Sequence, residues 1–72
     1  MSYDYSKLNG KIIEVCGTRN RFASLMGMAE ATMSLKLINK AAFKQTEIEK
    51  ALEILHIKVA DLGSYFFAKQ AQ

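Results

Sequence analysis

The chain has 72 residues; 50% of them are apolar, and ten Lys and Arg against seven Asp and Glu give a net charge of +3. A chain this short forms one small domain at most, so we expect residues 1–72 to be a single domain. The apolar content excludes a disordered tail, and the charge permits binding to nucleic acid without requiring it.

Three features of the sequence indicate in which compartment the protein works. The single cysteine, Cys16, cannot form an internal disulfide, which indicates a reducing compartment. The first five residues lack the basic and apolar regions of a signal peptide. No uncharged apolar run approaches the roughly 18 residues that a membrane span needs. We therefore expect a soluble, intracellular protein.

The first predicted helix follows Ser6 and ends at Gly17. Its apolar residues recur at i, i+4, i+7 and i+8, and this spacing predicts one buried face made of Leu8, Ile12, Val15 and Cys16. Gly10 inside this helix predicts either close packing against another helix or a later helix start. A buried, structural thiol is the interpretation of Cys16, because no basic neighbour is present to activate it.

The next two predicted helices are short and are separated by a turn. The second spans about residues 19–26, with Thr18 as its N-cap and with Phe22, Ala23 and Leu25 or Met26 buried. Gly27 breaks it and Met28 fills the turn. The third spans about residues 29–38 and places Met33 and Leu37 inward.

Two more helices complete the predicted all-α fold of five short helices. Phe43 is expected to anchor the loop before the fourth helix. Thr46 and Glu49 match a capping box that opens this helix, whose buried stripe is Ile48, Ala51, Leu52 and Leu55. The carboxylates of Glu47, Glu49 and Glu53 are expected on its solvated face. The fifth helix spans about residues 59–67, and its Tyr65, Phe66 and Phe67 cannot all face the core.

The sequence does not assemble a catalytic or metal-binding constellation. It has one histidine, His56, one cysteine and scattered carboxylates, which give no metal-ligand spacing and no pair of nucleophile and base. Gly27 does not belong to a phosphate-binding loop, since the glycine spacing and the Lys-Ser/Thr ending are absent. We therefore expect neither an enzyme nor a cofactor or metal site.

The stretch TRNRFASLMGMAEATMSLKL, residues 18–37, resembles the helix-turn-helix of phage repressors and Cro-like proteins. The shared features are Ala23, Gly27, Met28 and Met33. Ala23 lets the two helices cross closely, and Gly27 can take the positive φ of the tight turn. One helix precedes this unit and two follow it, as in the five-helix lambda-repressor/Cro-like domain.

Over its whole length, from the opening YDYSKLNGKIIE to the closing SYFF, the chain resembles the modulators of repression, or antirepressors, of temperate lactococcal phages. The resemblance implies a regulator of the lysis–lysogeny switch in the cytoplasm of the bacterial host. It implies binding to the phage's lysogenic repressor, in which we expect the N-terminal DNA-binding domain to be the partner; operator DNA, bound alone or jointly with the repressor, is the alternative. No membrane is involved, and a monomer or weak homodimer is expected.

The third helix departs from a DNA-reading helix at its start and on its outer face. Ala29 replaces the usual polar N-cap, and Glu30 stands among positions that read bases. At about 100° per residue, Ala31, Leu35 and Ile38 fall about 140° to 160° from the buried Met33. A helix that is apolar on two faces favours a second partner.

Three interpretations of this outer face follow from the residues. A protein partner is the first, and the residues expected to bind it are Glu30, Ala31, Ser34, Leu35, Ile38, Arg19, Asn20 and Arg21. DNA is the second, because leucine and alanine can touch thymine methyl groups. Its phosphates would be met by Arg19, Arg21, Lys36, Lys40 and Lys44. The third is an ordinary surface with scattered apolar residues and a basic rim that keeps the domain soluble.

Overall fold

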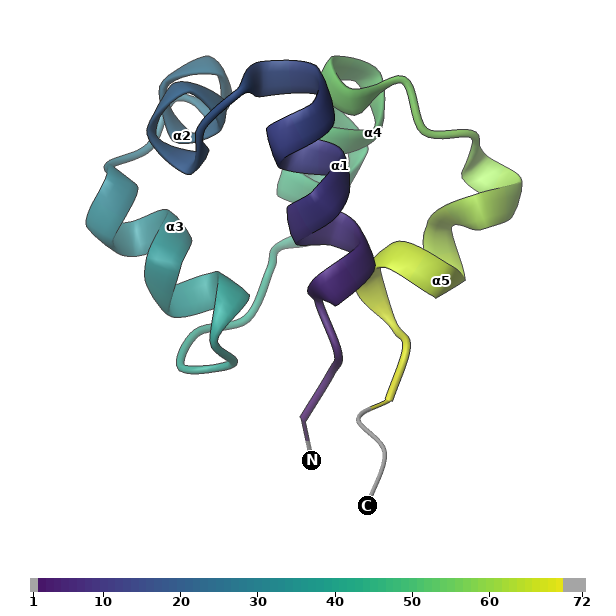
Figure 1. Cartoon of the computed structure of the whole chain (residues 1–72). Coiled ribbons are helices and arrows are strands. Elements are labelled where there is room, and N and C mark those ends of the chain that lie inside the picture. The colour runs from purple at the N-terminus through teal and green to yellow at the C-terminus, as the bar shows by residue number, and fades with distance from the viewer. Residues whose placement is uncertain (1, 70–72) are drawn as a thin grey trace.

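The computed structural model describes residues 2–69 and is all-α over that range (Figure 1). Five α-helices and one 3₁₀ helix follow one another along the chain: α1 (Ser6–Cys16), α2 (Arg19–Met26), α3 (Glu30–Leu37), α4 (Gln45–Leu55), η1 (Val59–Asp61) and α5 (Leu62–Phe66). The predicted all-α fold of five helices is therefore confirmed.

Local signals set the bounds of the first three helices. The side chain of Thr18 accepts a hydrogen bond of 3.1 Å from the Arg21 N–H, which caps α2 as predicted. Gly17 and Gly27 follow α1 and α2 with φ of 85° and 77°, a region that favours glycine. Helix α3 is one residue shorter at each end than the sequence predicts, and Ala29 at its N-cap provides no side-chain hydrogen bond.

The start of α4 corrects the predicted capping box. Helix α4 begins at Gln45 with Lys44 as its N-cap, so Thr46 lies inside the first turn. The Glu47 carboxylate reaches back and accepts a 2.8 Å hydrogen bond from the Lys44 N–H. The same capping interaction is therefore made two residues earlier than predicted, because Glu47 is also held by a side chain of α3.

The core surrounds α1, which packs against α2, α4 and α5, while α2 also packs against α3 and α4. The largest fully buried side chains are Phe22, Phe66, Leu8, Ile12, Met33 and Leu55. Cys16 is buried as a free thiol, as predicted, and Met28 and Phe43 pack against the core as expected. Of the alternatives at the end of α2, Met26 is the buried residue and Leu25 is 47% exposed.

Two predictions about α1 are wrong. Val15 is 38% exposed. The buried face of α1 consists only of Leu8, Ile12 and Cys16, which are spaced four residues apart and therefore lie on one side of the helix. Gly10 lies on the exposed side inside α1, and a Cβ placed there would meet nothing within 4 Å. It is neither a packing contact nor a helix start.

The C-terminal part differs in detail from the expected single helix. Residues 59–61 form a 3₁₀ turn and α5 covers only Leu62–Phe66. Phe66 is buried and Phe67 is 48% exposed, so the expectation that the aromatic run cannot be wholly buried is confirmed.

The two ends of the described chain lie side by side at one end of the molecule (Figure 1). The Asp4 N–H donates to the Ala68 carbonyl over 2.6 Å, and Tyr3 and Lys69 form an isolated antiparallel bridge. On its other side, the Tyr3 backbone exchanges two 2.9 Å hydrogen bonds with the Asn39 side chain. The N-terminal segment is thus held between the C-terminal segment and the loop after α3.

Candidate functional site

Helices α2 and α3 form the unit that positions the candidate site. The Met28 N–H donates a 3.0 Å hydrogen bond to the Ala23 carbonyl, which closes the turn after α2. Ala23 is 1% exposed and Met33 is fully buried, so the inner faces of both helices are used by the core. The order is helix, tight turn, helix, and it leaves the opposite face of α3 open.

The outer face of α3 carries the apolar stripe that the sequence predicts. Leu35 is 47% exposed, Ile38 is 56% exposed, and Ala31 is exposed one turn before Leu35. Their i, i+4, i+7 spacing places them along one line of the helix. We refer to Ala31, Leu35 and Ile38 as the α3 stripe.

Two polar residues lie beside the α3 stripe. The Ser34 hydroxyl donates to the Glu30 carboxylate over 3.2 Å, one turn apart on α3. Glu30 is exposed, and it lies in the first turn, where a carboxylate complements the helix dipole. This arrangement gives the start of α3 a negative charge that can accept hydrogen bonds from a cationic partner.

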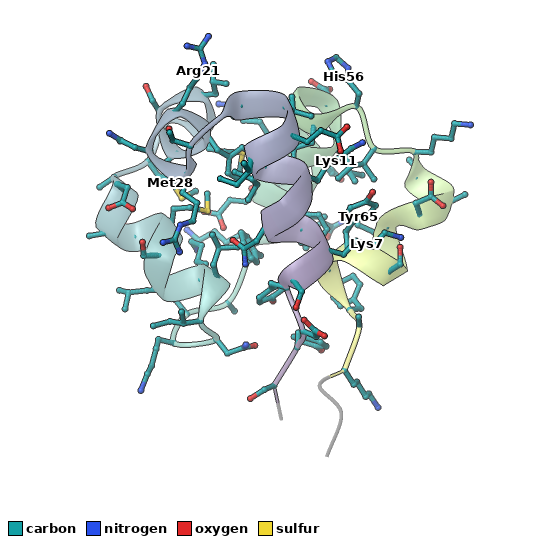
Figure 2. The ribbon with its side chains drawn as sticks, in the orientation of Figure 1. Lys7, Lys11, Arg21, Met28, His56 and Tyr65 are labelled. Atoms are coloured by element: carbon teal, nitrogen blue, oxygen red, sulfur yellow. The ribbon has the colours of Figure 1, made fainter. Side chains whose placement is uncertain are left out.

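Arg19, Asn20 and Arg21 are all exposed at the start of α2. In Figure 2, Arg21 points from α2 away from α3 and toward solvent. Lys40 and Lys44, which follow α3, are also exposed.

The prediction that Lys36 contacts DNA phosphates is wrong. Its side chain is 7% exposed, and its ammonium lies 2.9 Å from a Glu47 carboxylate oxygen and donates to the Ala42 carbonyl over 2.8 Å. The partners fix this ammonium inside the protein, so it does not face solvent or a phosphate. Glu47 is correspondingly half-buried, and the expectation that it lies on the solvated face of α4 is wrong.

The electrostatics of Glu47 follow from this pairing. Partial burial opposes ionisation of its carboxyl, but the hydrogen bond from the Lys44 N–H and the Lys36 ammonium outweigh that effect. The pKa of Glu47 is therefore lowered from its ordinary value.

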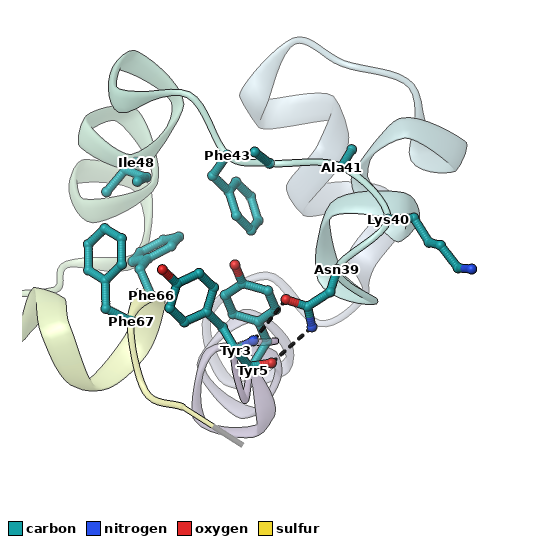
Figure 3. Close-up of a pocket in the computed structure, with 10 residues that line it drawn as sticks. Tyr3, Tyr5, Asn39, Lys40, Ala41, Phe43, Ile48, Phe66 and Phe67 are labelled. Carbon is teal, nitrogen blue, oxygen red and sulfur yellow. Dashed lines mark hydrogen bonds between the residues drawn. The ribbon is translucent and has the colours of Figure 1, made fainter. Parts of the chain in front are cut away.

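A second feature, an aromatic cavity at the end of the molecule where the termini meet, was not predicted. It has a volume of about 370 Å³ and lies between the N-terminal segment, the loop after α3 and the end of α5 (Figure 3). The sequence signals that could have indicated it are the alternation of Tyr3 and Tyr5 and the aromatic run Tyr65–Phe67, which cannot be wholly buried. Only the fold brings these to Phe43, a residue about forty positions from Tyr3.

Within residues 2–69, no group of three or more His, Cys, Asp or Glu side chains could hold a metal ion. His56 is exposed at the end of α4 and points to solvent in Figure 2. In the same part of the chain, no helix is long and apolar enough to cross a membrane.

Residues 2–69 thus form a small protein of five α-helices, in which a tight turn joins α2 to α3 and the outer face of α3 exposes apolar side chains. The chain belongs to a family described as proteins of unknown function (DUF739), whose profile matches residues 1–69. No curated protein sequence matches the chain.

A solved structure provides a more specific comparison. The chain is similar to the modulator of repression (MOR) of the temperate bacteriophage TP901-1 from Lactococcus lactis, whose structure was determined in solution. The two are 50% identical, with a TM-score of 0.81, and the alignment covers 99% of this chain and 97% of that chain. The resemblance to phage modulators of repression that the sequence predicts is thereby confirmed.

Proposed function

We propose that this protein is a phage antirepressor that binds the lysogenic repressor of its own phage through the exposed face of α3. Support for the regulatory role comes from the phage modulator of repression that is 50% identical over 99% of the chain. Support for the binding mode comes from one observation, the exposed α3 stripe of Ala31, Leu35 and Ile38.

The stripe is poorly suited to reading DNA. Discrimination between bases depends mainly on bidentate hydrogen bonds from Arg, Lys, Asn or Gln in the major groove. Leucine, isoleucine and alanine can contact only the thymine methyl group. Glu30 can accept a hydrogen bond from cytosine, but its charge repels phosphates. These side chains therefore contribute little binding free energy to sequence-specific contacts between α3 and DNA.

The same side chains suit the DNA-binding domain of a repressor. Such a domain presents Arg and Lys on the surface that meets DNA, so Glu30 would be attracted to it. The apolar α3 stripe would be removed from water at the centre of the contact, where truncation costs most. The proposed partner is therefore the N-terminal DNA-binding domain of the repressor, and its operator-binding surface is the part that would be covered.

The test is a pair of titrations with the full chain. Calorimetry with the co-encoded repressor is expected to give a complex, and an operator gel shift with this protein alone is expected to give none at physiological salt. A complex with the repressor that still binds operator would place both proteins on DNA together. The absence of repressor binding would overturn the proposal.

The second candidate is a Cro-like repressor that itself binds operator DNA. The exposed Arg19 and Lys40 favour it, since basic side chains near a helix-turn-helix can meet phosphates. Tight operator binding without a second protein, with a steep dependence on salt, would establish this function instead. Sedimentation of the free protein would at the same time test the expected monomer or weak homodimer.

A further inference from the structure

The aromatic cavity is built from segments that are distant in the sequence. Five rings line it, those of Tyr3, Tyr5, Phe43, Phe66 and Phe67 (Figure 3). Three edge-to-face pairs fix the rings, with centroid distances of 5.5 Å for Tyr5–Phe43, 5.3 Å for Phe43–Phe66 and 5.7 Å for Tyr3–Phe67. Such pairs hold each ring against its neighbours, so the cavity exists before anything binds. Its volume of about 370 Å³ falls within the range of ligand pockets.

Tyr5 places a polar group in this apolar space. Tyr5 is 8% exposed, and among the described residues no buried side-chain oxygen or nitrogen atom lacks a hydrogen-bond partner. Figure 3 shows the hydroxyl groups of Tyr5 and Tyr3 pointing into the space between the rings. A hydroxyl at the wall of an apolar cavity can donate a hydrogen bond to an acceptor atom of an incoming group.

The polar side chains that line the cavity carry no negative charge and can donate hydrogen bonds. Burial, assisted by the neighbouring Tyr3, raises the pKa of Tyr5, so its hydroxyl keeps its proton at neutral pH. The Asn39 amide is already used by the Tyr3 backbone. Lys40 is the one charged residue among those of the described chain that line the cavity, and it is exposed at the rim. A ligand with an apolar group beside a carboxylate complements this set.

We propose that the cavity is a second protein-binding site, which receives an apolar side chain from an acidic segment of a partner. A partner segment fits better than a free small molecule, because the apolar surface continues outside the cavity. Phe67 remains 48% exposed at its edge, and Lys40 extends from the rim into solvent. A peptide can cover both while its anchor side chain enters. This site goes beyond the proposed function, since none of the α3 stripe lines it.

Three capped tripeptides test the proposal with the full-length chain, with binding followed by two-dimensional NMR of the labelled protein. The probe acetyl-Asp-Phe-Asp-amide is expected to shift the amide signals of Tyr5, Lys40 and Phe67. Acetyl-Asp-Ala-Asp-amide, which lacks the anchor, is expected to bind at least about tenfold more weakly. Acetyl-Lys-Phe-Lys-amide, which reverses the charge, is expected to bind about fivefold more weakly or worse. Equal binding of the three probes, or no binding of the first, would overturn the proposal.

Two variants assign the interaction to the cavity. Tyr5→Phe keeps the ring and removes the hydroxyl, and it is expected to weaken the first probe about threefold to tenfold. Lys40→Gln removes the rim charge and is expected to weaken it about twofold to fivefold. Lys58→Gln, at an exposed lysine that does not line the cavity, is the matched control and should leave binding unchanged.

Thermal unfolding of each variant separates loss of binding from loss of the fold. Lys40→Gln changes an exposed side chain, so it remains informative if Tyr5→Phe lowers the stability. Unchanged probe affinity in both folded variants would overturn the proposal. The repressor titration of the previous section is independent of these probes, so the two proposals can fail separately.

Discussion

The Lys36 ammonium and the Glu47 carboxylate, 2.9 Å apart, join the last turn of α3 to the first turn of α4. The side chains are 7% and 20% exposed, so most of their surface is removed from water. Lys36 also donates to the Ala42 carbonyl, and Glu47 also accepts from the Lys44 N–H. The pair therefore fixes the loop that connects the proposed binding helix to the rest of the core, and a buried pair of this kind loses stability when one partner is removed.

Glu47→Gln is expected to lower the free energy of unfolding by about 1–3 kcal/mol. The substitution keeps the shape of the side chain but leaves the Lys36 ammonium without its counter-charge. Urea denaturation at neutral pH measures the change. Glu49→Gln, at an exposed position of the same helix, is the control and should change stability by less than about 0.5 kcal/mol.

A double-mutant cycle with Lys36→Met checks that the loss arises from the pair. Lys36→Met removes the buried charge and keeps an apolar stem of similar length. The double variant is expected to be more stable than the sum of the single losses predicts, because neither charge is then left alone. Strict additivity would mean that the pair is not the source of the effect.

Stability should also depend on pH through Glu47. Its pKa is lowered in the folded protein, so the unfolded chain takes up a proton first as the pH falls. The contribution of the pair is thus complete above the unfolded pKa of about 4.3 and is lost as the pH falls through the lower folded value. Denaturation of the parent and of Glu47→Gln at neutral pH and at about pH 3 should show their difference shrinking at the lower pH. A constant difference would contradict this assignment.

The helices were predictable because their signals are local, whereas this pair was not. Thr18 and Gly27 lie next to the ends that they determine, and α2 has the predicted bounds. Lys36 and Glu47 are eleven residues apart and meet only because the intervening loop folds back. The sequence pattern shows that Lys36 lies on the third predicted helix, but it does not show that the Glu47 carboxylate pairs with it.

The two candidate sites also differ in whether the sequence could predict them. The exposure of the α3 stripe follows from the spacing of residues within one helix, which the sequence contains. The aromatic cavity depends on Tyr5 meeting Phe43 and Phe66, which lie on different segments. No sequence periodicity relates such residues, so the cavity could not be predicted before the fold was known.

Two glycines give opposite expectations for the same substitution. Gly10→Ala should raise the free energy of unfolding by about 1 kcal/mol, because the site is exposed, helical and free of contacts within 4 Å. Gly27→Ala should lower it by about 1–2 kcal/mol, because φ there is +77° and an alanine is strained in that region. Its added Cβ would meet only the Lys50 ammonium at 3.8 Å, so crowding is not the cause. Thermal and urea denaturation measure both, and equal signs would contradict the assigned backbone roles.

Leu35→Arg is expected to weaken binding to the repressor by about tenfold or more while leaving the fold intact. Because Leu35 is already about half buried in the free protein, covering the rest of it contributes about 1 kcal/mol. The larger loss comes from bringing an arginine charge into an apolar contact and against the basic residues of a DNA-binding domain. Leu25→Arg is a matched control, since Leu25 is also 47% exposed and lies on α2 outside the proposed interface.

The charge of the same interface is tested by Glu30→Lys, with Glu53→Lys as the control at an exposed carboxylate of α4. If Glu30 faces a basic surface, its reversal should slow association and weaken the complex, and the effect should diminish as salt is added. Glu53→Lys makes the same change in net charge, so any general electrostatic effect will appear in both variants. Calorimetry and association kinetics at two salt concentrations provide the comparison. Should Leu35→Arg and Glu30→Lys both remain folded and bind the repressor as tightly as the parent, α3 is not the interface, and the aromatic cavity becomes the surface to test against the repressor.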